Sequence, residues 1–197
     1  LCVPALGESA IADVYCAEQN FTTKCDTRYT ASWEEGNGLR IWMNGESRVP
    51  NLLIFRRPQD QKLNDPVNYL NNVYREYIEN KYGGSAAATP CQTMTLGNKT
   101  VYVARYSYET NGSKLCSVRM IEAREDGDVE YEAKYPEDDP GNAVMALYVA
   151  VQYYATTSQT YSAVSQPTST VQPAASGKSF NVKKSQPIVS GVSAYKD

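Results

Sequence analysis

Residues 100–135 constrain the fold most strongly, because apolar and polar residues alternate along them and two turn sequences interrupt the alternation. A period of two is typical of β-strands that bury one face. The interrupting dipeptides, Asn111-Gly112 and Asp126-Gly127, are among those that tight hairpin turns favour. We therefore predict antiparallel strands at residues 100–109, 114–124 and 128–135, with a shorter strand near 90–96.

The register of the first predicted hairpin follows from its Asn-Gly turn. A two-residue turn there places Tyr108 opposite Leu115 and Tyr102 opposite Ile121, so that apolar residues face apolar residues.

The register of the second hairpin depends on the length of its loop, since a slip of one residue moves every side chain to the other face. A three-residue loop over 125–127 brings Ile121 opposite Tyr131 and Ala123 opposite Val129, with the glycine in the left-handed conformation. A two-residue turn would set glutamates against apolar residues. We therefore predict the three-residue loop.

Two helices and another hairpin flank these strands. Asp65 as N-cap and Pro66 at the first helical position begin one helix, which a pair of glycines at 83–84 ends. The second begins with the same device at Asp139 and runs to residue 154 with almost no polar face, so it should be covered on most sides. Residues 39–58 indicate two more strands around an Asn-Gly turn.

The predicted registers divide the sheet into two apolar faces. The second helix should cover the face formed by Tyr102, Ala104, Tyr106, Tyr108, Leu115, Ile121, Ala123, Val129, Tyr131, Ala133 and Tyr135. The opposite face carries Val101, Val103, Cys116, Val118 and Met120, and contiguous apolar area of this kind usually marks a contact. The first helix, the C-terminal tail or another molecule should cover it, and we prefer an intramolecular cover. Candidate binding residues are Val101, Val103, Val118 and Met120.

The acidic run after residue 121 is expected to be a solvated surface. In the predicted register Glu122, Glu130 and Glu132 share the outer face, with Glu122 opposite Glu130. A calcium site needs six to eight converging oxygens, whereas these carboxylates are spread along a ladder. We therefore predict no metal site and no cofactor.

The composition disfavours most catalytic mechanisms. The chain contains no histidine, so Ser-His-Asp, Cys-His and His-metal mechanisms are excluded, and no phosphate-binding or nucleophile-elbow motif occurs. A pair of carboxylates drawn from Glu34, Glu35, Glu46 and the later acids is still available to a hydrolase of glycans or peptides. We expect these acids to be surface residues.

The five cysteines lack the paired spacing of zinc or thioredoxin sites. Cys16 and Cys25 are candidates for a local disulfide in an oxidising compartment. Cys91 and Cys116 should lie two strands apart, about 10 Å, which is too far for a bridge. Cys2 is left as a thiol or for another chain.

The two tryptophans, Trp33 and Trp42, offer a platform for a sugar or peptide. Trp42 lies in an alternating strand beside a turn, where an aromatic residue is a favoured cross-strand partner, so we prefer a structural role for it.

Charge and targeting signals indicate the location. The net charge of −3 and the absence of a basic run disfavour nucleic acid and anionic lipid as partners. No stretch approaches the roughly 20 apolar residues that span a bilayer. Because the chain opens at Leu1, we expect a signal peptide to have been removed. Tyrosines are abundant, and Asn20, Asn98 and Asn111 begin Asn-x-Ser/Thr triplets, although such triplets often arise by chance. We expect a bacterial protein, extracytoplasmic and secreted or anchored at the cell surface.

Residues 99–136, "KTVYVARYSYETNGSKLCSVRMIEAREDGDVEYEAKYP", are followed by "GNAVMALYVAVQYYATT" at 141–157. This Tyr-rich strand, second strand, acidic Asp-Gly turn, strand ending in Tyr-Pro and closing helix resemble the Mog1/PsbP-like α/β sandwich over about residues 28–157. The resemblance implies an α+β fold, a twisted antiparallel sheet packed by two helices, with a binding or assembly role and no shared catalytic centre. No functional residue of the family can be placed on this chain.

We divide the chain into a cysteine-containing segment at 1–27, the α+β sandwich at 28–157 and a Ser/Thr/Pro-rich tail at 158–197. Residues 187–195 of the tail have strand-like composition and could extend a sheet edge in their own chain or in a homodimer. The favoured function is a binding or assembly module for a protein or carbohydrate at the cell surface. The alternatives are a carboxylate-dependent hydrolase and a structural spacer.

Overall fold

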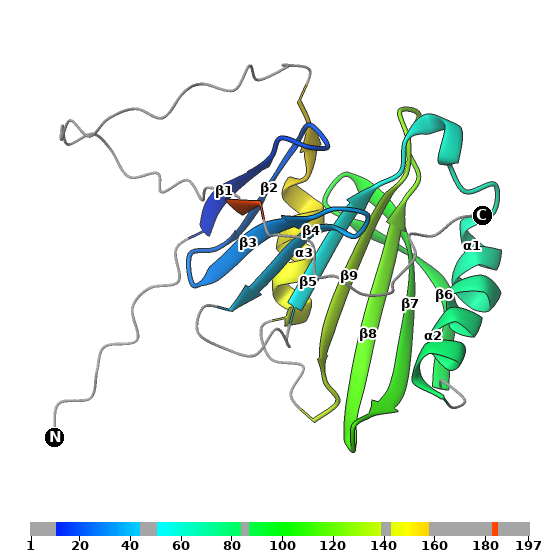
Figure 1. Ribbon diagram of the computed structural model, residues 1–197. Coiled ribbons are helices and arrows are strands. Elements are labelled where there is room, and N and C mark those ends of the chain that lie inside the picture. Colours follow the sequence, from blue (N-terminus) through cyan, green and yellow to red (C-terminus); the bar gives the residue numbers. More distant parts are fainter. Residues whose placement is uncertain (1–10, 44–50, 84–86, 139–142, 158–182, 185–197) are drawn as a thin grey trace, which may run out of the picture.

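The computed structural model describes residues 11–43, 51–83, 87–138, 143–157 and 183–184. They form the predicted α+β fold, in which an eight-stranded sheet is covered by helices on both faces and a three-stranded sheet lies beside it (Figure 1). The strand orders are β11-β3-β4-β5-β9-β8-β7-β6 and β1-β2-β10.

The strands of the large sheet are β3 (Tyr29–Glu34), β4 (Gly38–Met43), β5 (Asn51–Arg56), β6 (Ala87–Leu96), β7 (Lys99–Thr110), β8 (Ser113–Glu122), β9 (Val129–Pro136) and β11 (Lys183–Lys184). Those of the small sheet are β1 (Ile11–Cys16), β2 (Phe21–Asp26) and β10 (Ala155–Thr156). The helical elements are η1 (Gln59–Gln61), α1 (Pro66–Asn68), η2 (Tyr69–Val73), α2 (Tyr74–Tyr82) and α3 (Ala143–Tyr153).

The first predicted hairpin is confirmed in both turn and register. Tyr102 pairs with Ile121 and Tyr108 with Leu115 across β7 and β8. Asn111 and Gly112 have φ of 50° and 74°, the left-handed values that a two-residue turn of this kind requires. The strands predicted at 90–96 and 39–58 also exist, as β6 and as the pair β4 and β5, although the turn between β4 and β5 lies outside the described residues.

The predicted register of the second hairpin is wrong by one residue. Met120, not Ile121, pairs with Tyr131, and Glu122 pairs with Val129, so residues 123–128 form a longer connection. The backbone just after β5 holds this connection in place: the Arg57 amide donates to the carbonyl of residue 128 at 2.8 Å. A Cβ on Gly127, whose φ is 122°, would lie 2.1 Å from the Arg57 carbonyl oxygen.

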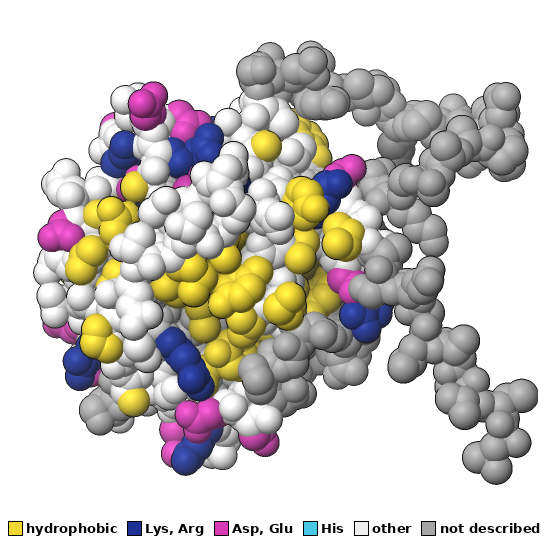
Figure 2. All heavy atoms as spheres, turned by 180° about the vertical axis from the view of Figure 1, so that it is seen from behind, with side chains coloured by type: hydrophobic (Ala, Val, Ile, Leu, Met, Phe, Trp, Pro, Cys, Tyr) yellow, Lys and Arg dark blue, Asp and Glu magenta, His cyan; other side chains and the backbone are white. Residues whose placement is uncertain are grey.

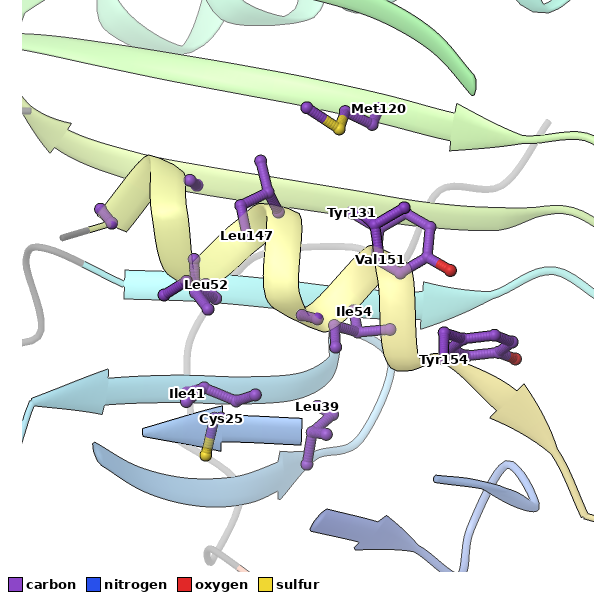
Figure 3. Packing of buried hydrophobic residues seen from close by; sticks show 14 of the residues in the cluster. Cys25, Leu39, Ile41, Leu52, Ile54, Met120, Tyr131, Leu147, Val151 and Tyr154 are labelled. Atoms are coloured by element: carbon purple, nitrogen blue, oxygen red, sulfur yellow. The ribbon is translucent and has the colours of Figure 1, made fainter. Parts of the chain in front are cut away.

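The corrected register changes the membership of the two faces. Val129, Tyr131, Ala133 and Tyr135 belong to the same face as Val101 and Met120, and α3 covers that face. In Figure 3, Leu147 and Val151 of α3 lie among Leu52, Ile54, Tyr131 and Met120. The helix formed by α1, η2 and α2 covers the other face, which carries Ala104, Tyr106, Tyr108 and Ile121. The prediction that the second helix covers the Tyr102 face is therefore wrong.

The start and end of the first helix are confirmed. The Asp65 carboxylate accepts a hydrogen bond from the amide of Asn68 at 2.9 Å, and Gly83 ends the helix with φ of 73°. The start of α3 predicted at Asp139 lies outside the described residues.

The outer side of α3 is less covered than predicted. The helix carries no charged residue, and its inner side is buried. Met145 and Tyr153 are nevertheless 61% and 44% exposed. Figure 2, the view from behind, shows hydrophobic side chains gathered in one area of that surface. Within the described residues, no helix combines the length and apolar character needed to cross a membrane.

The N-terminal hairpin contributes to the main core, and its register excludes the predicted disulfide. Cys16 pairs with Phe21, while Cys25 pairs with Ala12. The two cysteines are therefore four residues apart along the ladder, roughly 13 Å, well beyond the span of a disulfide. Both thiols are free and buried.

The described part of the tail adds a short strand to the edge of the large sheet. The backbone of Lys183–Lys184 pairs in parallel with Ser32 and Trp33 of β3. The segment 187–195, for which strand addition was predicted, lies outside the described residues.

Candidate functional site

Two glutamates predicted to be solvated lie buried beneath the first helix. Glu130 and Glu132 on β9 are 1% and 2% exposed, and Arg119, which pairs with Glu132 on the neighbouring strand, is 4% exposed. The prediction of a wet outer face is wrong because the shifted register turns these two side chains onto the face covered by η2 and α2. Charged groups this deep are stable only when paired and hydrogen-bonded.

Glu130 is held between two arginines. It forms ion pairs with Arg57, just after β5, and with Arg119 on β8. The hydroxyl of Tyr69 donates to the same carboxylate at 3.5 Å, and Arg57 in turn donates to the Tyr69 oxygen at 3.3 Å. Strands β5, β9 and β8 are adjacent in the sheet, so their order brings these groups together.

Glu132 accepts hydrogen bonds on both carboxylate oxygens. Tyr74 and Ser117 donate to Oε1, and Arg119 and Lys134 lie 3.3 and 3.5 Å from Oε2. Burial alone would raise the pKa of Glu132, but the charges of Lys134 and Arg119 and the hydrogen bonds from Ser117 and Tyr74 outweigh it. They lower the pKa from 4.5 to about 2, so the group is ionised at neutral pH.

The π-helical turn η2 explains how two tyrosines of one helix reach both glutamates. In an α-helix, residues five apart point about 140° away from each other. In η2 the amide of Tyr74 donates to the carbonyl of Tyr69, which places both side chains on the side facing the sheet. The centroids of the two tyrosine rings are 6.1 Å apart. The Arg119 guanidinium also lies over the Tyr74 ring, with its central carbon 4.0 Å from the ring centroid. Single π-helical turns are frequent at functional sites.

A cavity of about 300 Å³ opens beside this network, between α2 and the central strands. Its charged lining consists of the two glutamates and five cationic side chains, Arg40, Arg57, Lys81, Arg119 and Lys134. The remaining lining residues are Gly36, Asn37, Leu53, Phe55, Gln61, Tyr74 and Tyr77. The cavity thus combines apolar surface with an excess of positive charge, and its volume is at the lower end of those that hold small ligands.

Glu122, predicted to lie opposite Glu130, belongs to the other face. It is paired with Arg124 at 3.1 Å and with Lys99 at 3.6 Å, and the Tyr131 hydroxyl donates to it at 2.8 Å. Lys99 also donates to the carbonyls of Val151 and residue 154, at 2.8 and 2.6 Å. A positive charge at the C-terminal end of α3 stabilises that helix, so this cluster has a structural role.

The apolar residues proposed as a binding surface are part of the core. Val101, Val118 and Met120 are buried, and Val103 packs against them. The cover predicted for them is intramolecular, as preferred, but α3 supplies it. None of the four lines the cavity.

The two tryptophans do not form one platform. Trp33 pairs with Leu39 and packs against the core under α3, whereas Trp42 pairs with Thr30 on the opposite face of the sheet. Both are partly buried, and neither lines the cavity.

Sequence reasoning missed the arginines and tyrosines of the network, although one signal was present. With the correctly predicted register of β7 and β8, Arg119 shares a face with Ile121 and Tyr106. An arginine at an inward position requires a carboxylate partner, because a buried charge is otherwise too costly. Within the described residues, no cluster of Cys, Asp and Glu is arranged to hold a metal ion.

Comparison with known proteins gives a fold but no family. No protein-family model and no curated protein matches the chain. Among solved structures, the cyanobacterial PsbP (CyanoP) of Synechocystis sp. PCC 6803 aligns with a TM-score of 0.56 and 11% identity, over 79% of this chain and 97% of that chain. A protein of Bacteroides thetaiotaomicron VPI-5482 aligns with a TM-score of 0.51 and 10% identity, over 74% of this chain and 48% of that one. At such identities the likeness shows the fold alone, and that fold is PsbP-like, as the sequence resemblance predicted.

Proposed function

We propose that this PsbP-like chain is a non-catalytic binding module that acts outside the cytoplasm and holds a small ligand in the cavity between α2 and the sheet. The observation that carries the proposal is the cavity itself, whose floor is a buried ion network with its carboxylates already paired. A network of this kind fixes its side chains before a ligand arrives. Preorganisation of that kind lowers the cost of binding.

The chemistry of the two buried glutamates favours binding over hydrolysis. A glycosidase needs one carboxyl that is protonated and can donate. Glu132 has a pKa of about 2, so it is deprotonated at any physiological pH. Glu130 forms ion pairs with both Arg57 and Arg119. Glu132 therefore cannot be the general acid of a carboxylate-dependent hydrolase in this cavity.

The location outside the cytoplasm is an inference from the sequence. The triplet asparagines Asn20, Asn98 and Asn111 all lie in turns between strands. Asparagine tolerates the left-handed backbone of such turns, and φ is 51° at Asn20 and 50° at Asn111. Turn geometry alone therefore accounts for these two asparagines, and their triplets do not support the location. Fractionation of the native host, with detection of the endogenous chain, tests the location, and recovery in the cytosol alone would contradict it.

Filling the cavity tests the binding proposal. Leu53 on β5 lines the cavity and is half-buried, so Leu53→Trp should block it. Met145→Trp, at an exposed position on α3, is the matched control. The chain should be purified from its native host and examined by native mass spectrometry for a bound small molecule. We expect the ligand on the wild type and on Met145→Trp but not on folded Leu53→Trp. Equal retention by both variants would contradict the cavity as the binding site.

A further inference from the structure

The charges and donors around the cavity identify the class of its ligand: we propose that it binds a small organic anion, a carboxylate, sulfonate or phosphate attached to an apolar body. This inference rests on the proposed binding function. It adds the chemical class of the ligand.

The first argument is the balance of charge. Five cationic side chains line the cavity against two carboxylates, an excess of three positive charges. One of the five, Arg40, is paired with Glu34, which does not line the cavity, so the excess is reduced but not removed. The side chains of Arg40 and Lys134 are only 24% and 15% exposed, and partly buried charges are weakly screened by salt.

The second argument is the shortage of acceptors. All four oxygens of Glu130 and Glu132 already receive hydrogen bonds or ion pairs from the protein. Each guanidinium carries five N–H donors, more than these oxygens can take up. Within the part of the chain that the structure describes, the buried Nε of Arg119 has no hydrogen-bond partner. A ligand that carries acceptor oxygens would therefore find donors on these cations that the two glutamates do not occupy.

The third argument concerns the body of the ligand. Leu53 and Phe55 of β5 and the rings of Tyr74 and Tyr77 provide apolar walls beside the cations. A volume of about 300 Å³ equals that of roughly ten liquid water molecules, which admits one ring or a short chain with an anionic group. Guanidinium groups match the planar geometry of carboxylates and the oxygens of phosphates. A bare inorganic anion has no apolar group to contact these walls.

The test compares molecules of one shape and different charge. Benzoate, benzenesulfonate and phenyl phosphate are titrated against the full chain beside neutral benzamide and cationic benzylamine, with binding followed by NMR shifts. We expect a Kd on the order of 1 mM for the best anion, and binding at least about tenfold weaker for benzamide, since each charge-assisted contact contributes about that factor. Comparison of the three anions identifies the preferred group.

Two variants locate the site. Lys81 lines the cavity and is exposed, so Lys81→Met should keep the fold while weakening the preferred anion several-fold. Lys114→Met, at an exposed position on β8 outside the cavity lining, should leave the affinity unchanged. Urea midpoints within error of the wild type establish that both variants are folded.

The outcomes separate the two proposals. Equal binding of benzamide and benzoate, with both lost in Leu53→Trp, overturns the anion class and leaves the cavity as a ligand site. Anion binding that Lys81→Met and Leu53→Trp do not affect places the anion elsewhere and overturns the inference. No binding by any of the probes overturns it too, while a ligand retained from the native host would still support the binding function.

Discussion

Replacing Glu132 by Gln tests the buried network most directly, because the folded-state pKa of this carboxylate is about 2 against an ordinary value of 4.5. At 1.36 kcal/mol per pKa unit, the difference corresponds to about 3.4 kcal/mol of stability at neutral pH. Glutamine keeps an acceptor for Tyr74 and Ser117 but turns an NH₂ group toward Arg119 and Lys134, where the carboxylate accepted. We expect Glu132→Gln to lower the free energy of unfolding by about 3 kcal/mol at pH 7.

The stability that Glu132 contributes should depend on pH. The pKa of Glu132 is depressed in the folded state, so its contribution is complete above the unfolded pKa and is lost as the pH falls from about 4.5 toward 2. At about pH 3 roughly 1.4 kcal/mol of the contribution remains. The difference between the wild type and Glu132→Gln should therefore narrow by about 2 kcal/mol between pH 7 and pH 3.

Urea unfolding followed by the fluorescence of Trp33 and Trp42 measures both quantities. Glu109→Gln, at an exposed position on β7, is the control and should change the stability by less than about 0.5 kcal/mol at either pH. A Glu132→Gln effect that is equal at pH 7 and pH 3 would refute the assignment of Glu132 as an ionised partner in the folded state. An effect below about 1 kcal/mol at pH 7 would refute it as well.

Three further experiments test other parts of the fold. Gly127→Ala should lower the unfolding free energy by about 3 kcal/mol or more, since its Cβ would meet a backbone oxygen at 2.1 Å, whereas Gly112→Ala, with nothing within 4 Å, should cost about 1 kcal/mol. Equal effects in urea unfolding would contradict the packed connection. Lys99→Met should destabilise by about 1–3 kcal/mol, because its ammonium group donates to two carbonyls at the end of α3, and an unchanged melting curve would contradict this role. Burial raises the pKa of the Cys16 and Cys25 thiols to about 12, so both should resist iodoacetamide in the folded protein, and peptide mapping that finds rapid alkylation would contradict their burial.

The contrast between the two hairpins shows which part of the fold local sequence determines. The Asn-Gly turn fixes its own geometry, so the pairing of Tyr102 with Ile121 could be predicted from adjacent residues. The second connection is held by Arg57, which is about 70 positions earlier in the chain and follows β5. The pairing of β5 with β9 is not visible in any local pattern, so the register could not be fixed from residues 114–135 alone.

The error in register also came from the rule used to choose it. That rule places apolar residues opposite apolar residues, and it fails where facing positions carry buried charges. Here Arg119 lies opposite Glu132 and Ile121 lies opposite Glu130, all of them buried. Charges of opposite sign on facing positions satisfy the sheet as well as apolar pairs do, provided that hydrogen bonds complete them. A search for inward arginines would have indicated the site, whereas the π-helical turn that supplies the tyrosines has no signature in the sequence.

Glu132→Gln should weaken the fold but strengthen anion binding. These opposite effects distinguish the role of the network in stability from its role in the charge of the cavity. Glu132→Gln removes one of two negative charges from the cavity lining and frees donors of Arg119 and Lys134. Stability should fall, while the Kd for the preferred anion should decrease several-fold in the fraction that is folded. Titration by NMR under conditions where the variant is folded measures this. An affinity that falls together with stability would mean that the network supports only the helix above it, and not the charge of the cavity.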